Sequence, residues 1–178
     1  MSPPNINVDI TVNGRKRQVH DVPASLSLHD FLSEDLGLTG TKLCCGIGVC
    51  RACTVILHGV PGATPVPILS CSTPVAEVNG QSIDTVEGLA SQPTGLTSLQ
   101  RAFLDEFAFQ CGYCTPGLLM AAHALLERLR LAPIPRAQVD EVILEACGEH
   151  FCRCTGYVRY HTAIRKVILA TPGLVLGD

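Results

Sequence analysis

The sequence lacks several features by which whole classes of protein are recognised. No apolar run approaches the length of about 18 residues that a membrane helix needs. The net charge is −3 and the pI is about 6.0, and the basic run at residues 15–17 is typical of a solvated hairpin, so we expect no nucleic-acid partner. Neither a GxGxxG motif nor a phosphate-binding loop is present, so no flavin is expected to bind to this chain alone.

The first ten residues lack the basic and apolar regions of a signal peptide, and we therefore expect the chain to be made in the cytoplasm. Against this background the ten cysteines are unusual, because reducing compartments do not sustain structural disulfides. The rest of the composition, 47% hydrophobic and 16% charged, is that of a folded protein. Metal binding is the better explanation for the cysteines.

The N-terminal half has the pattern of a small α+β unit. Residues 5–12 alternate apolar and polar side chains, and Asn13 and Gly14 supply the positive φ angles of a two-residue hairpin turn. Apolar residues then recur at helical spacing from a cap at Ser25 or Ser27 until Gly37. Three further segments, "CTVILHG", "ILSCSTPVAEV" and "QSIDTV", are predicted to form short strands between turns.

Residues 88–97 break all periodicity with Gly, Pro and Ser, which indicates a linker. Beyond it the pattern is helical, with Pro133 and Pro135 between the second and third helices and "TPG" at the end of the fourth. Four short helices with apolar faces predict a compact bundle. Their stripes are Leu99, Phe103 and Phe107; Leu118, Ala122, Leu125 and Leu129; Val139, Val142, Ile143 and Ala146; and Tyr160, Ile164, Val167 and Ile168.

One group of four cysteines has the spacing of a plant-type [2Fe-2S] ferredoxin. Cys45, Cys50 and Cys53 follow CxxxxCxxC, and Cys71 lies further along the chain. A loop can deliver three thiolates to such a cluster only if its backbone wraps closely around the inorganic sulfides. The residues that allow this wrap, because they have no side chain and accept positive φ, are Gly46 and Gly48.

A second group of four falls in the helical half, at predicted helix junctions, and consists of Cys111 and Cys114 with Cys152 and Cys154. A CxxC pair alone is weak evidence, since redox and zinc sites use it too. Structural zinc is therefore an alternative here, although CxC is an awkward spacing for zinc. The two remaining cysteines, Cys44 and Cys147, are predicted to be small buried apolar residues.

At this point the chain resembles the iron-sulfur subunit, or N-terminal iron-sulfur region, of the molybdenum hydroxylases, the xanthine dehydrogenase and aldehyde oxidoreductase family. Five segments look like that family in the right order: "EDLGLTGTKLCCGIGVCRACTV", "SCSTPV", "TVEGL", "FQCGYCTPGLLMAA" and "CRCTGY". The resemblance spans nearly the whole chain.

The resemblance implies an α+β protein of two domains. Residues 1–88 would form a β-grasp, plant-type ferredoxin-like domain with one [2Fe-2S] cluster, and residues 89–178 an all-α four-helix-bundle domain with the other. The ligands implied are Cys45, Cys50, Cys53 and Cys71 in the first domain and Cys111, Cys114, Cys152 and Cys154 in the second.

The resemblance also implies partners. The helical-domain cluster would lie next to the molybdopterin cofactor of a large subunit, with Gln110 and Cys114 as contacts to the pterin. The other cluster would lie toward an acceptor, which is FAD in a flavin subunit or haem c in a cytochrome c subunit. The complex would be cytoplasmic, or periplasmic if exported with a signal-bearing partner.

This chain departs from the family pattern at three positions. Cys44 and Arg51 stand where the family tends to have glycine, and His150 stands where it often has asparagine. A cation beside a cluster favours the reduced state, so Arg51 is predicted to raise its reduction potential.

Two functions of other classes remain open on the sequence alone. A freestanding ferredoxin-like carrier would also need iron-sulfur clusters, but it would not need the helical domain or Gln110. A zinc-stabilised interaction module would be colourless. A catalytic cysteine-histidine pair has little support, because His150 is the one histidine near a ligand motif.

Overall fold

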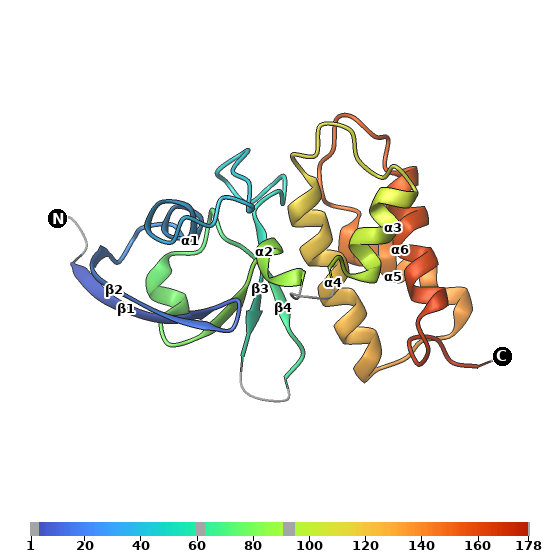
Figure 1. The fold of residues 1–178 in the computed structure, drawn as a ribbon, viewed down its shortest axis with the longest axis horizontal. Coiled ribbons are helices and arrows are strands. Elements are labelled where there is room, and N and C mark those ends of the chain that lie inside the picture. The colour runs from blue at the N-terminus through green and yellow to red at the C-terminus, as the bar shows by residue number, and fades with distance from the viewer. Residues whose placement is uncertain (1–3, 60–62, 91–94, 178) are drawn as a thin grey trace.

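The computed structural model describes residues 4–59, 63–90 and 95–177. The sheet and its covering helix occupy one half of the molecule, and the longer helices occupy the other half (Figure 1). The two termini lie at opposite ends of the long axis in this view. The protein is therefore of mixed α and β structure, with the sheet in the N-terminal part of the sequence, as expected.

The sheet contains five strands in the order β2-β1-β5-β3-β4. The strands β1 (Asn5–Val12) and β2 (Arg15–Pro23) form the predicted hairpin, with φ angles of 51° at Asn13 and 74° at Gly14. The strand β5 (Ser82–Asp84) pairs in parallel with β1 and antiparallel with β3. The strands β3 (Thr54–His58) and β4 (Val66–Leu69) are antiparallel and lie at the other side of the sheet.

The predicted first helix is α1 (Leu28–Asp30), which continues as a π-helical turn over Phe31–Asp35. Of the two candidate caps, Ser27 is the one that caps the helix, because its hydroxyl accepts the amide of Asp30 at 3.0 Å. The chain turns away at Gly37, whose φ is 69°. The helix covers the sheet and completes a core that consists of Val8, Ile10, Val12, Val22, Leu28, Phe31, Leu32, Val55, Val75, Val78 and Ile83.

One predicted strand is wrong in part. The segment "ILSCSTPVAEV" contributes its first two residues to β4, but Val75–Val78 is a 3₁₀ helix that follows Pro74. Residues three apart share a face in a 3₁₀ helix, so Val75 and Val78 are both buried in the core. In a strand, residues three apart would point to opposite faces, so this spacing fits the 3₁₀ helix and not the predicted strand.

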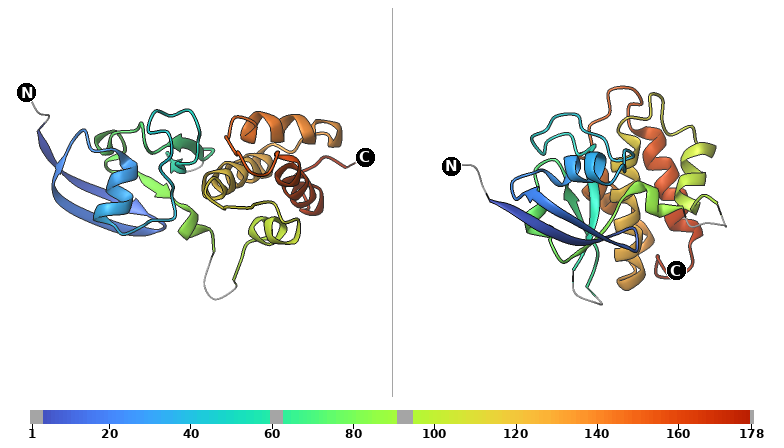
Figure 2. Two further views of the ribbon diagram at one scale, coloured as in Figure 1. Left: turned by 90° about the horizontal axis from the view of Figure 1, so that it is seen from above. Right: turned by 60° about the vertical axis from the view of Figure 1, so that its left-hand side comes forward.

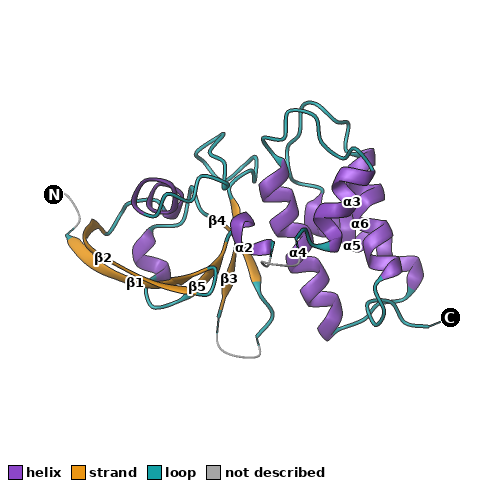
Figure 3. Cartoon of the chain, viewed as in Figure 1, coloured by secondary structure: helices purple, strands orange, loops and turns teal. Residues whose placement is uncertain are grey.

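The helical half begins with α2 (Val86–Leu89), whose last two residues overlap the range 88–97 that was predicted as linker. Residues 91–94 of that range lie outside the described structure. Four longer helices follow: α3 (Ser98–Asp105), α4 (Thr115–Leu131), α5 (Val139–Cys147) and α6 (Val158–Ala170) (Figure 3). All four predicted helices are therefore present, but α4 has 17 residues and is not short.

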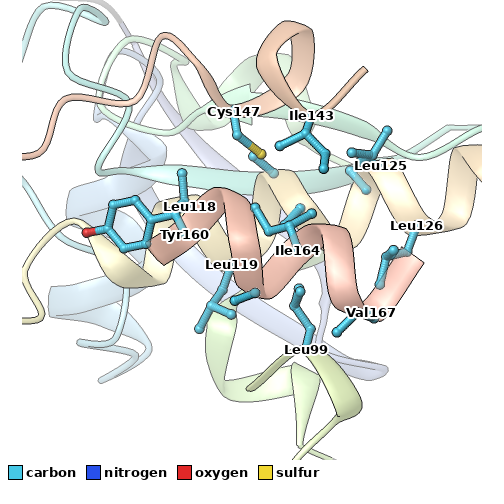
Figure 4. Close-up of a cluster of buried hydrophobic side chains, with 14 of the residues drawn as sticks. Leu99, Leu118, Leu119, Leu125, Leu126, Ile143, Cys147, Tyr160, Ile164 and Val167 are labelled. Atoms are coloured by element: carbon cyan, nitrogen blue, oxygen red, sulfur yellow. The ribbon is translucent and has the colours of Figure 1, made fainter. Parts of the chain in front are cut away.

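One residue of the predicted stripes is misplaced. Phe107 lies beyond the end of α3, has a φ of 50° and is 72% exposed, so it does not belong to the apolar face. The remaining residues of the four stripes are buried or partly buried in the core of the helical half (Figure 4). No helix among the described residues has both the length and the apolar character needed to cross a membrane.

The strand β3 joins the two halves. Successive side chains of a strand point to opposite faces, and here Val55 belongs to the core under α1 whereas Ile56 belongs to the core of the helical half. The helix α4 packs across this strand, and Figure 2 shows the helical half lying beside the β3 and β4 side of the sheet. The helical half is thereby held against the strand that directly follows the first cysteine-rich loop.

Candidate iron-sulfur sites

The cysteine-bearing loops gather at one end of the molecule. The loop before β3 carries Cys45, Cys50 and Cys53, and the loops that precede α4 and α6 carry the second group of cysteines. All three loops lie at the upper side of Figure 1. The structure brings Cys45 next to Cys50 and Cys53 next to Cys71 in the first predicted group, and it forms two close pairs in the second.

The first pair is Cys45 and Cys50. The amide of Cys50 donates to the Sγ of Cys45 at 3.4 Å, and the φ angles of Gly46 and Gly48 are 68° and 74°, as the predicted wrap requires. Hydrogen bonds from the backbone at Cys50, and next at Ile47, lower the pKa of Cys45 to about 6. The loop is thus built to stabilise a thiolate at Cys45.

The second pair, Cys53 and Cys71, is brought together by strand pairing. Thr54 of β3 pairs with Leu69 of β4, which places Ser70 opposite Cys53. The amide and the hydroxyl of Ser70 donate to the carbonyl of Cys53 at 3.2 Å and 2.8 Å. Burial raises the pKa of Cys53 to about 12, and the neighbouring Cys71 thiol adds to this rise. A proton on Cys53 must therefore be displaced when a metal binds.

The helical half contributes the third and fourth pairs. The Sγ atoms of Cys111 and Cys154 lie 3.6 Å apart on exposed loops. The pair Cys114 and Cys152 is buried, and both sulfurs contact the hydroxyl of Tyr160, at 3.0 Å and 3.1 Å. Each pair takes one cysteine from the loop before α4 and one from the loop before α6.

The two thiols of the buried pair differ in acidity. Burial raises the pKa of Cys114 to about 11, against the opposing hydrogen bond from Tyr160. Burial also raises the pKa of Cys152, but hydrogen bonds from Thr155 and Tyr160 outweigh burial and leave it at about 7. Each group of four therefore contains one cysteine that can lose its proton near neutral pH, Cys45 in the first group and Cys152 in the second.

Paired thiols fit a two-iron cluster. Two sulfurs bound at about 2.3 Å to one tetrahedral metal lie about 3.8 Å apart, close to the 3.6 Å between Cys111 and Cys154. Within the described residues, no three His, Cys, Asp or Glu side chains surround a single metal-ion position. A [2Fe-2S] cluster takes its four thiolates as two pairs, one pair on each iron.

The two cysteines outside the groups behave differently. Cys147 is buried at the end of α5, as predicted, and burial raises its pKa to about 12. The prediction that Cys44 is buried is wrong, because this residue is exposed. Adjacent side chains in the loop diverge, so the turn that directs Cys45 toward Cys50 directs Cys44 outward.

The second group of thiols shares a cavity with one cysteine of the first group. This cavity, of about 170 Å³, is lined by Cys50 of the first group, by Cys111, Cys114, Cys152 and Cys154 of the second, and by Cys44. The amide of Phe151 donates to the carbonyl of Cys50 at 3.1 Å. A single backbone hydrogen bond therefore links one cysteine of the first group to the residue that precedes Cys152.

Neighbouring residues reinforce this link. Glu149 forms an ion pair with Arg51, and the buried His150 contacts the hydroxyl of Thr54 through Nε2 at 3.2 Å. Burial, followed by the positive charge of Arg51, lowers the pKa of His150 to about 4, so its ring is neutral near pH 7. Three consecutive residues, 149–151, thus each contact the loop of the first group.

Sequence reasoning did not find these contacts. Phe151 acts through its backbone, which carries no side-chain signal, and Tyr160 was assigned only to an apolar stripe. Gln110, the predicted contact to a pterin, is exposed and directly precedes Cys111. Arg51 lies in the first loop with a φ of 60°, a conformation that favours glycine.

Two family models match the chain. The "2Fe-2S iron-sulfur cluster binding domain" matches residues 10–76, and the "[2Fe-2S] binding domain" matches residues 85–165. The fold and the paired thiols, together with these matches, define a protein with two [2Fe-2S] sites.

Relatives of similar length identify the class of protein more narrowly. The nicotine 6-hydroxylase small subunit of Paenarthrobacter nicotinovorans is 41% identical over 96% of this chain and 92% of its own. The nicotinate dehydrogenase small FeS subunit of Eubacterium barkeri is 39% identical over 92% and 95%, respectively. The structure of quinoline 2-oxidoreductase from Pseudomonas putida 86 matches with a TM-score of 0.78 and 36% identity, over 96% of this chain and 94% of the matched chain.

The chain belongs to the 2Fe-2S subunits of the molybdenum hydroxylases, which confirms the resemblance found in the sequence. It is an electron-transfer subunit of an oxidoreductase and not the subunit that carries out the substrate chemistry.

Proposed function

We propose that this chain passes electrons one at a time from the molybdenum cofactor of a large partner subunit, through two [2Fe-2S] clusters, to an acceptor. When bound, a [2Fe-2S] cluster supplies one-electron redox chemistry. Cys45, Cys50, Cys53 and Cys71 would hold one cluster in a β-grasp domain of residues 1–88. Cys111, Cys114, Cys152 and Cys154 would hold the other in a four-helix-bundle domain of residues 89–178.

The link between the loops that carry the two groups of thiols is the observation that carries the proposal. Two independent redox proteins would have no reason to share a cavity lined by the cysteines of both. Here Cys50 and Phe151 are joined by a backbone hydrogen bond, and Phe151 is bonded covalently to Cys152. The chain thereby fixes the separation of the two sites, which is the property that an electron conduit needs.

The surface around the thiols supports docking to large partners. Ile47 and Val49, in the loop of the first group, are 73% and 66% exposed, and Phe151, beside the second group, is 57% exposed. Apolar side chains left in water beside a redox site are typical of an interface. We assign the side with Gln110 and Cys114 to the pterin of the molybdenum subunit, and the side with Ile47 to the acceptor, which is a flavin or a cytochrome c.

Isolation of the native complex under anaerobic conditions tests the proposal. We expect this chain to copurify with a molybdopterin protein and to contain about four irons and four inorganic sulfides, because each [2Fe-2S] cluster holds two of each. Two distinct paramagnetic signals should develop on reduction. Recovery of the chain alone, with both clusters intact, would instead identify a freestanding carrier.

The zinc alternative predicts a different result. A zinc-stabilised module would be colourless, would contain no inorganic sulfide and would show no signal on reduction. The thiol pairs described above disfavour it, because four thiolates around one ion would have to converge on one point.

A further inference from the structure

Tyr160 is placed where it can act on one pair of cysteine sulfurs. It is 4% exposed, and its ring stacks on Phe103 with ring centroids 5.8 Å apart and an interplanar angle of 24°. Figure 4 shows this ring at the start of α6, with its oxygen directed away from Leu118 and Ile164. The hydroxyl lies 3.0 Å from the Sγ of Cys114 and 3.1 Å from the Sγ of Cys152.

Packing alone does not explain this hydroxyl. A phenylalanine at this position would fill the core and stack on Phe103 equally well, and burial of a hydroxyl is unfavourable unless it is hydrogen-bonded. Its hydroxyl lies within hydrogen-bond distance of both sulfurs, and the hydroxyl of Thr155, which donates to Cys152, lies beside it. When metal is bound, cysteine ligands carry no proton, so the tyrosine must be the donor.

The environment of the two pairs in the helical half is unequal. The buried pair, Cys114 and Cys152, receives the Tyr160 hydroxyl, and Cys152 also receives the Thr155 hydroxyl at 3.2 Å. The exposed pair, Cys111 and Cys154, receives no side-chain hydroxyl from any residue that the structure describes. The side-chain donors are therefore concentrated on one end of the site.

We propose that Tyr160 is a positioning residue whose single O–H proton is shared between the Cys114 and Cys152 thiolates in a bifurcated hydrogen bond, and which thereby raises the reduction potential of the helical-half cluster. This inference rests on the proposed function. Reduction adds one negative charge, so a donor at the sulfurs stabilises the reduced state more than the oxidised state, and hydrogen bonds to sulfur are among the factors that set such potentials.

The test is a potentiometric titration of Tyr160→Phe in the full cluster-loaded chain, followed by paramagnetic resonance. We expect the helical-half signal to appear at a lower potential, by about 59 mV if reduction becomes tenfold less favourable for one electron. The signal of the other cluster should not move. The matched control is Tyr113→Phe, since Tyr113 is adjacent to Cys114 but donates to the carbonyl of Leu43.

An unchanged helical-half potential in Tyr160→Phe would overturn the proposal, as would an equal shift in Tyr113→Phe. Should Tyr160→Phe fail to retain its cluster, incorporation of 3-fluorotyrosine in a Tyr113→Phe, Tyr157→Phe background, in which Tyr160 is the one tyrosine left in the sequence, decides. A more acidic phenol is a stronger donor, so the potential should rise, and a constant or lower potential refutes the role. Failure of the proposed function can be distinguished from failure of this inference, because it would appear as missing iron or a missing signal in the unmodified protein.

Discussion

Gly117 offers the sharpest test of how the two halves are joined. It is the third residue of α4 and is buried against the backbone of the first cysteine loop. A Cβ atom at this position would lie 2.5 Å from the carbonyl oxygen of Arg51 and 2.7 Å from that of Ala52. Because these atoms belong to the backbone, they cannot rotate away, and Gly117→Ala must displace either the helix or the loop.

The size of the effect follows from these distances. Ordinary contact begins at 3.4 Å, so the closer oxygen must move by about 0.9 Å. Overpacking of this kind lowers the free energy of unfolding by about 1–3 kcal/mol, and the higher helix propensity of alanine offsets up to about 1 kcal/mol of this loss. We expect Gly117→Ala to lower the free energy of unfolding by about 1–2 kcal/mol, measured from urea unfolding of the cluster-loaded chain by circular dichroism.

Gly59→Ala is the matched control, because a Cβ at Gly59 meets no atom of the described residues within 4 Å and its φ is not in the left-handed region. This control should be neutral or stabilised by up to about 1 kcal/mol, through the smaller entropy of the unfolded chain. Electron transfer between the clusters, measured by pulse radiolysis, should also be slower in Gly117→Ala and unchanged in Gly59→Ala. A Gly117→Ala protein as stable as the control would refute the reasoning.

Three further predictions follow from the sites. Cys53→Ser should remove or weaken the paramagnetic signal of the first cluster and spare the other, and Cys152→Ser should do the reverse; loss of both signals together in folded protein would contradict the division into two sites. Arg51→Gly should lower the reduction potential of the first cluster, and Glu149→Gln should raise it, because Glu149 offsets the positive charge of Arg51 in the unmodified protein. If a redox titration showed equal shifts of the same sign in both variants, this electrostatic explanation would be excluded. Cys44→Ser should leave both signals intact, and a lost signal in its resonance spectrum would make Cys44 a ligand.

The sequence predicted the elements that depend on local pattern. The Asn13-Gly14 turn, a cap at Ser25 or Ser27 and the apolar faces of α4, α5 and α6 could be predicted, because a spacing of 2 or 3.6 residues reports directly on burial. The predicted strand through Val75 was wrong, because a spacing of three residues places Val75 and Val78 on one face in a 3₁₀ helix but on opposite faces in a strand. The placement of Phe107 in an apolar stripe was wrong, because the helical spacing of apolar residues continues in the sequence beyond the point where α3 ends.

The grouping of the cysteines could also be predicted, since thiols at these spacings have few other uses in a reducing compartment. Which two cysteines of a group lie in contact could not be predicted. The contact of Cys53 with Cys71 depends on the register of β3 against β4, and the contact of Cys111 with Cys154 depends on two loops far apart in sequence. Such pairings are tertiary properties, and no local pattern encodes them.

The turn between α5 and Cys152 shows why the link between the sites is invisible in the sequence. Within 149–151, the side chain of Glu149 pairs with Arg51, the ring of His150 reaches Thr54, and the amide of Phe151 binds the carbonyl of Cys50. The ion pair is largely exposed and contributes at most about 1 kcal/mol, so the buried contacts must set the position of the turn. Because Cys152 follows directly, any change in the length of this turn alters the second site and its distance from the first together.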